Sequence, residues 1–174
     1  GNTFVATWRR FGDSNSTDAV MSSVSTNRGV KWSLNTISNI VQFDQGSSNV
    51  TFRTNTLPWM TSDGTAFHTF WAERAAGSNL PRIKVSSSKN GATWNAPAFV
   101  DNVPLGFQVV PSATASEGVV QVAWYDTRDD LTQFQGPLIN GLPFLNDFID
   151  AAGKIRRHTI DVRAAQGTWN GSKL

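Results

Sequence analysis

The sequence predicts an all-β protein in which short antiparallel strands recur as four-stranded sheets. Residues that favour helices are scarce: only Glu73 and Glu117 are glutamates among thirteen acidic residues, whereas serine, threonine, asparagine and glycine abound. Two segments, 25–32 and 87–94, each carry a glycine turn closed by a tryptophan. Other tryptophans return at matching distances from these turns, which indicates an internal repeat.

The first repeat opens with residues 2–10, which alternate large and small side chains with the period of two that is typical of a strand. A polar loop at 12–18 separates this segment from a weaker strand at 19–25. The first glycine turn follows, and a third strand is predicted at 37–43.

The same order begins again in the middle of the chain. Leu57-Pro58 opens a strand, and residues 62–65 form a turn. The next two strands are predicted at 66–74 and 82–86, and the second of them leads into the glycine turn at 87–94.

The third repeat opens a strand at Val110-Pro111, turns at Glu117-Gly118 and continues as a strand over 119–128. An apolar, turn-rich insertion at 131–153 follows, ahead of a strand predicted at 155–162. The insertion either packs down as a small lid or helix turn, or exposes apolar residues to a partner.

The spacing of prolines and tryptophans fixes the repeat boundaries. Pro58 precedes Trp71 by thirteen residues, and Pro111 precedes Trp124 by the same number. The boundaries are therefore predicted at 1–48, 49–104 and 105–174. A unit of roughly 50–60 residues with four strands has the size of one blade of a β-propeller.

Tryptophans at these repeated positions are predicted to fill the space between neighbouring sheets, because a large aromatic side chain buries much surface there. The six are Trp8, Trp32, Trp71, Trp94, Trp124 and Trp169. Trp59 belongs to neither series, and we interpret it as a core residue in preference to a platform for a sugar ring.

The glycine turns resemble the Asp-box, or bacterial neuraminidase repeat, of the sialidases, whose pattern is Ser-x-Asp-x-Gly-x-Thr-Trp. The matching positions are Ser25, Asn27, Gly29 and Trp32 in the first copy, Ser87, Gly91, Thr93 and Trp94 in the second, and Gly167 and Trp169 in a third, reduced copy. Asn27 and Lys89 stand where the family has aspartate, and Lys31 replaces the threonine. Asn27 can still accept amide hydrogen bonds, whereas Lys89 cannot. The second turn is therefore expected to depend mainly on Gly91 and Trp94.

This resemblance covers nearly the whole chain and implies about half of a six-bladed, sialidase-like β-propeller. Three blades leave sheet edges open and do not close a ring. The chain is therefore expected to be a fragment of a longer polypeptide, or to be completed by other copies of itself or by another subunit.

In such an architecture the loops that follow the second strand of each blade lie on one face, opposite the glycine turns. This predicted rim contains Arg10, Arg53, Glu73, Arg74, Asp126, Arg128 and Asp129, beside the insertion at 131–153. One hypothesis is a sugar-acid pocket, in which arginines hold a carboxylate and an aspartate acts as general acid. The alternative is that Glu73/Arg74 and Asp126/Arg128 are ion pairs at strand ends between blades.

The sialidases use three arginines, an aspartate acid, and a tyrosine nucleophile assisted by a glutamate. Of their Phe/Tyr-Arg-Ile-Pro motif the chain keeps only Phe52-Arg53, with the proline displaced to Pro58. The single tyrosine, Tyr125, is adjacent to Trp124 within a predicted strand, which is a poor setting for a nucleophile.

Composition excludes several other classes. The formal net charge is +2 and the pI is about 9.3, but the basic residues are scattered, which argues against a nucleic-acid partner. No apolar run reaches the roughly 20 residues that membrane insertion needs. With no cysteine and only His68 and His158 as histidines, no metal and no cofactor is expected.

The sequence thus predicts a secreted or cell-surface module with a non-catalytic binding or assembly role, whose partner is a glycan or a protein. The alternative is part of a sialidase-type glycoside hydrolase that acts on terminal acidic sugars. Long loops on a rigid scaffold commonly carry binding, so the insertion at 131–153 is the preferred contact surface.

Overall fold

The computed structural model describes residues 2–41, 56–74, 80–103, 105–129, 160–172 and 174, and four two-residue strands between positions 138 and 156. All regular structure in these residues is β, arranged as three antiparallel sheets and two short strand pairs, which confirms the predicted all-β class. The same residues contain no helix long and apolar enough to cross a membrane.

Only the second sheet has the predicted four strands; the first and third sheets have three each in the described residues. The first sheet has the order β1 (Phe4–Arg10), β2 (Ala19–Ser25), β3 (Ser33–Asn39). The second has the order β4 (Trp59–Ser62), β5 (Phe67–Arg74), β6 (Pro81–Ser88), β7 (Ala98–Phe99). The third has the order β14 (Asp161–Thr168), β9 (Val119–Asp126), β8 (Gln108–Ser116). The short pairs are β10 (Leu138–Ile139) with β11 (Leu142–Pro143), and β12 (Phe148–Ile149) with β13 (Ile155–Arg156).

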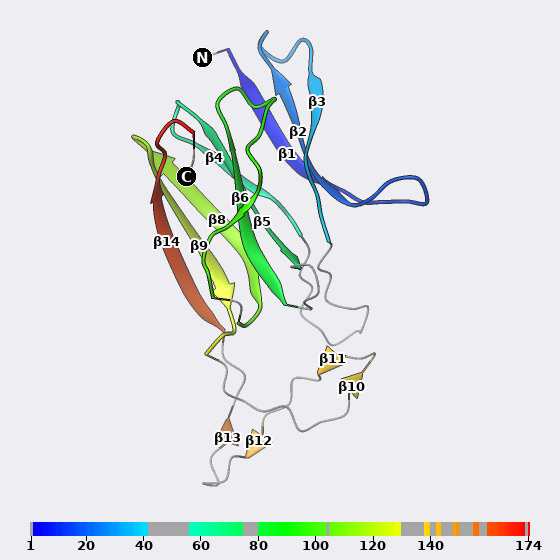
Figure 1. The fold of residues 1–174 in the computed structure, drawn as a ribbon, viewed down its shortest axis with the longest axis vertical. Coiled ribbons are helices and arrows are strands. Elements are labelled where there is room, and N and C mark those ends of the chain that lie inside the picture. The colour runs from blue at the N-terminus through cyan, green and yellow to red at the C-terminus, as the bar shows by residue number, and fades with distance from the viewer. Residues whose placement is uncertain are drawn as a thin grey trace.

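The three sheets stack face to face in chain order, with the second sheet in the middle (Figure 1). The opening strands of the second and third sheets, β4 and β8, lie against each other. The indole N–H of Trp59 in β4 donates a hydrogen bond of 2.9 Å to the carbonyl of Ala113 in β8. Trp59 therefore connects two sheets. The prediction that it is a core residue is wrong, because its side chain is 48% exposed.

Apolar side chains fill both sheet-on-sheet interfaces. Between the second and third sheets the buried residues are Phe70, Ala72, Ile83 and Val85 on one side and Val120, Val122 and Trp124 on the other. Between the first and second sheets Trp71 packs with Val20, Ile40 and Ile37. Because side chains alternate along a strand, Phe70 and Trp71 enter different interfaces from neighbouring positions of β5.

The core prediction for the tryptophans is confirmed at two positions. Trp71 is fully buried and Trp124 is 4% exposed, and each lies between two sheets. For Trp32 it is wrong, because that side chain is 48% exposed and its indole N–H donates to the carbonyl of Gly29 in its own turn, at 2.9 Å. Trp8, Trp94 and Trp169 are partly buried.

The first glycine turn has the expected hydrogen bonds. The side-chain oxygen of Asn27 accepts the backbone N–H of Lys31 at 2.8 Å, and the hydroxyl of Ser25 accepts that of Gly29 at 2.8 Å. Gly29 has a φ of 86°, which a residue with a side chain rarely adopts.

The second turn is shifted by one residue from the predicted pattern. Asn90 supplies the accepting oxygen, for the N–H groups of Ala92 and Thr93 at 2.9 and 2.8 Å, and the hydroxyl of Ser88 accepts the N–H of Gly91. Gly91 has a φ of 73°, and the indole N–H of Trp94 donates to its carbonyl at 3.0 Å, so both predicted residues take part in the turn and Asn90 and Ser88 hold it as well. The hydroxyl of Ser87 does not bond within the turn and lies 2.8 Å from Nδ1 of buried His68, whereas its backbone carbonyl accepts the N–H of Asn95 at 2.9 Å.

The third turn begins later than predicted. Gly167 and Trp169 do not form it, because β14 runs through Thr168. The turn comes next: the side-chain oxygen of Asn170 accepts the N–H of Ser172 at 3.0 Å, and Gly171 has a φ of 91°. Asn170-Gly171 thus corresponds to Asn90-Gly91.

Two predicted strands are misplaced. The strand predicted at 37–43 is β3, which starts immediately after the first turn because Ser33 already pairs with Val24 of β2. The strand predicted at 155–162 contains the short β13 at its start and overlaps β14 only at its end, because β14 pairs with β9 from Asp161 to Thr168. In both cases the neighbouring strand, rather than local hydrophobicity, fixes the boundaries.

Candidate functional site

The predicted rim residues that the structure describes occur at the ends of β1, β5 and β9. These three strand ends lie at the lower end of the stack in Figure 1, and the turns at 25–32 and 88–94 lie at the upper end. Arg53 and the insertion at 131–153 fall outside the described residues, apart from the short strands named above.

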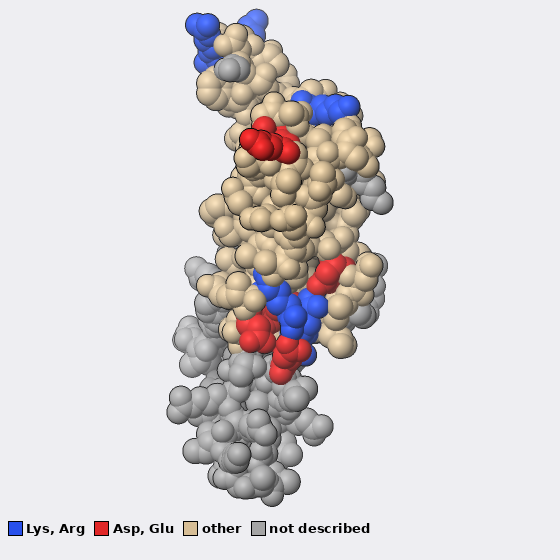
Figure 2. Space-filling model, turned by 90° about the vertical axis from the view of Figure 1, so that its left-hand side faces the viewer, with Lys and Arg blue, Asp and Glu red and all other residues tan. Residues whose placement is uncertain are grey.

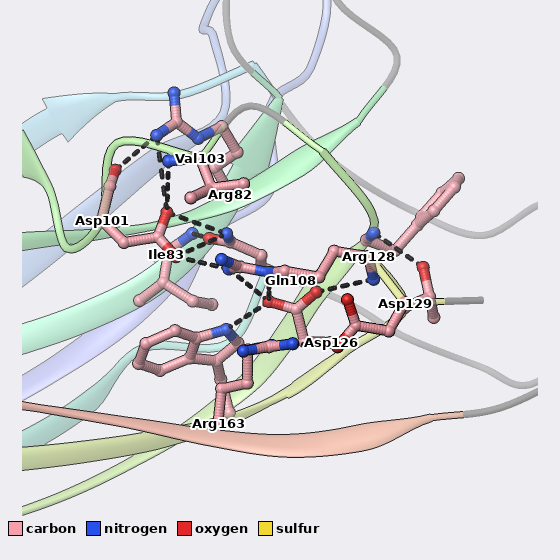
Figure 3. A network of polar contacts seen from close by, with 12 residues as sticks. Arg82, Ile83, Asp101, Val103, Gln108, Asp126, Arg128, Asp129 and Arg163 are labelled. Carbon is pink, nitrogen blue, oxygen red and sulfur yellow. Dashed lines mark hydrogen bonds and ion pairs between the residues drawn. The ribbon is translucent and has the colours of Figure 1, made fainter. Parts of the chain in front are cut away.

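The carboxylate of Asp126 is the centre of a polar network at this end (Figure 3). Asp126 is fully buried at the end of β9. Its Oδ2 accepts the indole N–H of Trp124 at 2.9 Å and two guanidinium N–H groups of Arg128 at 2.9 and 2.6 Å. Its Oδ1 accepts the backbone N–H of Arg128 at 2.8 Å. Four hydrogen bonds thus compensate for removing this charge from water.

The network continues into the second sheet through the loop between β7 and β8. Arg128 also pairs with Asp101, whose carboxylate accepts the side-chain amide of Gln108 at 3.0 and 3.2 Å. Gln108 is fully buried, and its oxygen accepts the backbone N–H of Ile83 in β6 at 3.0 Å. Arg82, next to Ile83, forms an ion pair with Asp101, with Nη2 3.6 Å from Oδ1. Its guanidinium group also stacks over the ring of Phe99 in β7.

Gly106 allows the loop to approach Arg128 closely. A Cβ at position 106 would lie 2.4 Å from the backbone N and 2.6 Å from Cα of Arg128, well inside contact distance. The φ of Gly106 is 71°, in the region that favours glycine. The backbones of Phe107 and Thr127 are hydrogen bonded beside it, at 3.2 Å. The position of Arg128 is therefore fixed by backbone contacts as well as by charge.

The charges of the network balance. Asp101 and Asp126 face Arg82 and Arg128, so the cluster contributes two negative and two positive charges. For both carboxyls, burial is the largest influence and opposes ionisation, but hydrogen bonds from Arg128 and neighbouring groups outweigh it and lower each pKa. The same two carboxylates raise the pKa of Arg128. The cluster is thus a closed set of ion pairs with no surplus positive charge for an anionic ligand.

These pKa shifts predict that the network loses its stabilising effect in acid. A carboxyl whose pKa is lower in the folded than in the unfolded state stabilises the fold above its ordinary pKa of 3.8, and this contribution is lost as the pH falls further. We expect the difference in unfolding free energy between the parent chain and Asp101→Asn to be constant from pH 7 to 5 and to shrink below pH 4. Urea unfolding followed by tryptophan fluorescence from pH 7 to 2 measures it, and a difference that persists undiminished at pH 2 contradicts this assignment.

Glu73 does not face the predicted rim. It is 4% exposed, and its carboxylate accepts the indole N–H of Trp71 at 2.7 Å and pairs with Lys84 of β6. The proposed Glu73/Arg74 ion pair is therefore replaced by a pair inside the second sheet. In contrast, the proposed Asp126/Arg128 pair is present.

The remaining described rim residues, Arg10, Arg74 and Asp129, contact nearby groups, and the backbone N–H of Arg74 donates to the carbonyl of Val41 at 3.2 Å. Arg10 donates to the backbone carbonyl of Thr17 in its own β1–β2 loop, at 3.0 Å. Asp129 pairs with Arg163 of β14 on a more exposed part of the surface. The strands β1, which ends at Arg10, and β9, which ends two residues before Arg128, lie on opposite sides of the second sheet (Figure 1), so the structure does not bring these two arginines together to clamp one carboxylate.

Tyr125 is also separated from the network. Its neighbours in β9, Trp124 and Asp126, point into the interface with the second sheet, so Tyr125 points to the opposite face, where it is 43% exposed. Two hollows in the described surface, of about 340 and 480 Å³, both lie away from the rim. The first is bordered by Ser87 and Ser172 near the turns, and the second by Ala123 and Ala164 on the third sheet.

Sequence reasoning missed Arg82, Asp101 and Gln108. Asp101 lies in a loop with no recognisable motif, and its partners come from three different segments. No local sequence pattern therefore indicates these contacts. One available signal was overlooked: Trp71-Ala72-Glu73 and Trp124-Tyr125-Asp126 repeat a tryptophan followed two residues later by an acid. Residues two apart share a face of a strand, which is how each indole reaches its carboxylate.

Within the described part of the chain, no three or more histidine, aspartate or glutamate side chains are grouped in a way that could hold a metal ion. Comparison of the chain with protein-family models, with curated proteins and with solved structures gives no match. Its function is therefore argued from its own residues.

Proposed function

We propose that the three sheets are consecutive blades of a sialidase-like β-propeller and that the chain is a non-catalytic binding and assembly module. We place it outside the cell or on the cell surface, with a glycan or a protein as its partner. The observation that carries the non-catalytic role is the engagement of the described rim acids in ion pairs.

The blade arrangement is supported by how the sheets repeat. Successive strands are neighbours in the first and second sheets, the third sheet differs only in that β14 pairs with β9 after the two short strand pairs, and the opening strands β4 and β8 of two successive sheets meet. Asparagine–glycine turns follow β6 and β14 at corresponding places, and the tryptophan–acid hydrogen bond recurs in β5 and β9. Such agreement between sequence repeat and contacts is typical of radially repeated folds.

The chemistry of the rim acids supports binding over hydrolysis. A general acid must reach the substrate and titrate near the working pH. Asp126 is fully buried, with four hydrogen bonds and a lowered pKa, and Glu73 is held between Trp71 and Lys84. Neither carboxyl is placed to donate a proton to a leaving group.

The test combines an activity assay with a capture assay on the same preparation. We expect no release of the fluorescent aglycone from a fluorogenic sialoside, and retention of the chain on surfaces carrying terminal acidic sugars or on a protein partner of those surfaces. Arg53→Ala serves as the matched variant, because Arg53 is the arginine in the Phe-Arg pair that resembles the sialidase motif. Turnover in the parent chain that disappears in Arg53→Ala establishes the hydrolase and refutes the non-catalytic module.

A further inference from the structure

The two internal interfaces of the stack follow one rule. Trp124 lies on the face of the third sheet that packs on the second, and Trp71 lies on the face of the second sheet that packs on the first. The opposite face of the second sheet, which carries Phe70 and Ala72, receives the third sheet. In each case the face that bears the tryptophan packs on the preceding sheet, and the other face receives the next one.

The third sheet has an outer face that corresponds to the receiving face of the second sheet. Side chains alternate, so Ala123 and Tyr125 of β9 point away from the second sheet, and Ala164 of β14 pairs with Ala123 on the same face. Tyr125 is 43% and Val162 is 69% exposed. A hollow of about 480 Å³ runs over the small residues Ser112, Ala123 and Ala164.

This outer face carries no charge at its centre. Figure 2 looks onto the side of the stack where the third sheet lies, and the charged side chains stand toward the upper and lower parts of the described surface with uncharged atoms between them. The polar groups over the hollow include Gln121 and Gln166, whose amides bond to each other at 3.0 Å. An exposed, uncharged sheet face of this kind is typical of an interaction surface.

The first sheet has the complementary outer face. Phe4 of β1 pairs with Ser25, as Phe67 of β5 pairs with Ser88. A tryptophan follows four residues after each phenylalanine, so Trp8 occupies in the first sheet the position that Trp71 has in the second. Val5 lies beside Gly91 of the second turn and so faces the second sheet. Side chains alternate along β1, so Phe4 and Trp8, at even positions, point to the opposite, outer face.

Large apolar side chains are exposed on this outer face. Phe4 is 50% exposed, and Leu34 of β3, which pairs with Ser23 beside Ala6, is 69% exposed. The first sheet therefore ends the stack with a face of large side chains, of which Trp8 is the repeat equivalent of the buried Trp71 and Trp124.

We propose that a second copy of this chain docks head to tail on the outer face of the third sheet, using the outer face of its own first sheet. The contact continues the established sheet-on-sheet interfaces: Phe4, Trp8 and Leu34 of one copy fill the hollow over Ala123 and Ala164 of the other. Like-with-like pairing of two third sheets sets hollow against hollow, and the large exposed side chains of that face, Tyr125 and Val162, do not border the hollow. The inference deepens the assembly role proposed above and rests on the same repeat equivalence.

A contact between unlike faces has a distinct consequence for assembly. After docking, the assembly as a whole still has one free face of each kind, so association continues until a ring closes, or it grows as an open chain. In either case the mass increases with protein concentration, and blocking one face on every copy stops association.

The test uses two single variants of the full chain. Leu34→Glu places a charge on the outer face of the first sheet, and Ala164→Arg places one on the outer face of the third; both positions are exposed, so the fold is expected to persist. Sedimentation velocity should show concentration-dependent association of the parent chain and monomers of 19.0 kDa for each variant alone. Val30→Glu, at a turn position that is 78% exposed, is the matched control and should associate like the parent chain.

Mixing the two variants decides between head-to-tail and other contacts. Each retains the face that the other has lost, so an equimolar mixture should form a dimer of twice the monomer mass and nothing larger. A parent chain that stays monomeric at all concentrations overturns the proposal and leaves this face to a different partner. Association that survives Leu34→Glu, or a mixture that stays monomeric, overturns it as well. Capture by glycan surfaces, measured on monomeric Ala164→Arg, reports on the proposed binding role independently of assembly.

Discussion

Replacing Arg128 with alanine is expected to destabilise the fold by about 3–5 kcal/mol, because it leaves a buried carboxylate without its charged partner. Asp126 is fully buried and receives three of its four hydrogen bonds from Arg128. The variant keeps the backbone N–H and the indole donor of Trp124, but loses both guanidinium contacts. It also removes the charge that Asp101 faces across the interface between the second and third sheets.

Urea unfolding at pH 7, followed by tryptophan fluorescence and circular dichroism, measures this loss. Arg163→Ala is the matched control, since Arg163 pairs with an Asp129 whose side chain is 61% exposed, and such a pair contributes about 1 kcal/mol or less. If both variants lose the same small amount, the buried network does not hold the two sheets together. If Arg128→Ala is too unstable to purify, Arg128→Lys takes its place, because it retains the charge. Its loss of unfolding free energy should be larger than that of Arg163→Ala and smaller than that expected for Arg128→Ala.

Much of the fold follows from short-range patterns. The alternation of large and small residues in 2–10 predicts β1, because a strand with two different faces shows its period directly in the sequence. The strand predicted at 66–74 coincides with β5, which is buried on both faces and shows no such alternation. The predicted strand at 19–25 coincides with β2. The boundaries of β3 and β14 were not predictable in this way, since they are set by hydrogen bonding to β2 and β9 rather than by their own side chains.

The turns show why a motif can locate a feature and still misassign its parts. Asn90 and Asn170 each lie immediately before a glycine with positive φ and accept the N–H two residues ahead. In the first turn Asn27 lies two residues before Gly29, as in the eight-residue pattern. The later turns are one residue shorter between asparagine and glycine, so a fixed pattern assigned the role of Asn90 to Lys89.

The candidate site was predictable in its location but not in its contacts. Strand order alone brings the ends of β1, β5 and β9 to one end of the stack. Whether an acid there faces solvent or the interior depends on alternation along the strand and on partners far away in sequence. Asp101 is 27 residues from Arg128, and Gln108 is 25 residues from Ile83, so these contacts appear only once the sheets are stacked.

The recurrent tryptophan–acid pair leads to the second large effect. Trp71→Ala is expected to destabilise the fold by about 3–5 kcal/mol, because the change removes a fully buried indole between the first and second sheets. It also removes the 2.7 Å hydrogen bond to the buried Glu73 carboxylate. Trp71→Phe separates the two contributions, since it retains a ring but not the N–H; loss of a hydrogen bond to a charged group accounts for about 1.5–3 kcal/mol.

Trp32→Ala provides the comparison at a tryptophan of a different kind. That side chain is 48% exposed and bonds only within its own turn, so its removal is expected to change the unfolding free energy by about 1 kcal/mol. Differential scanning calorimetry and urea unfolding measure all three variants. Equal losses for Trp32→Ala and Trp71→Ala contradict the assignment of Trp71 to the space between the sheets. They also remove the basis for treating Trp8 as an interface residue.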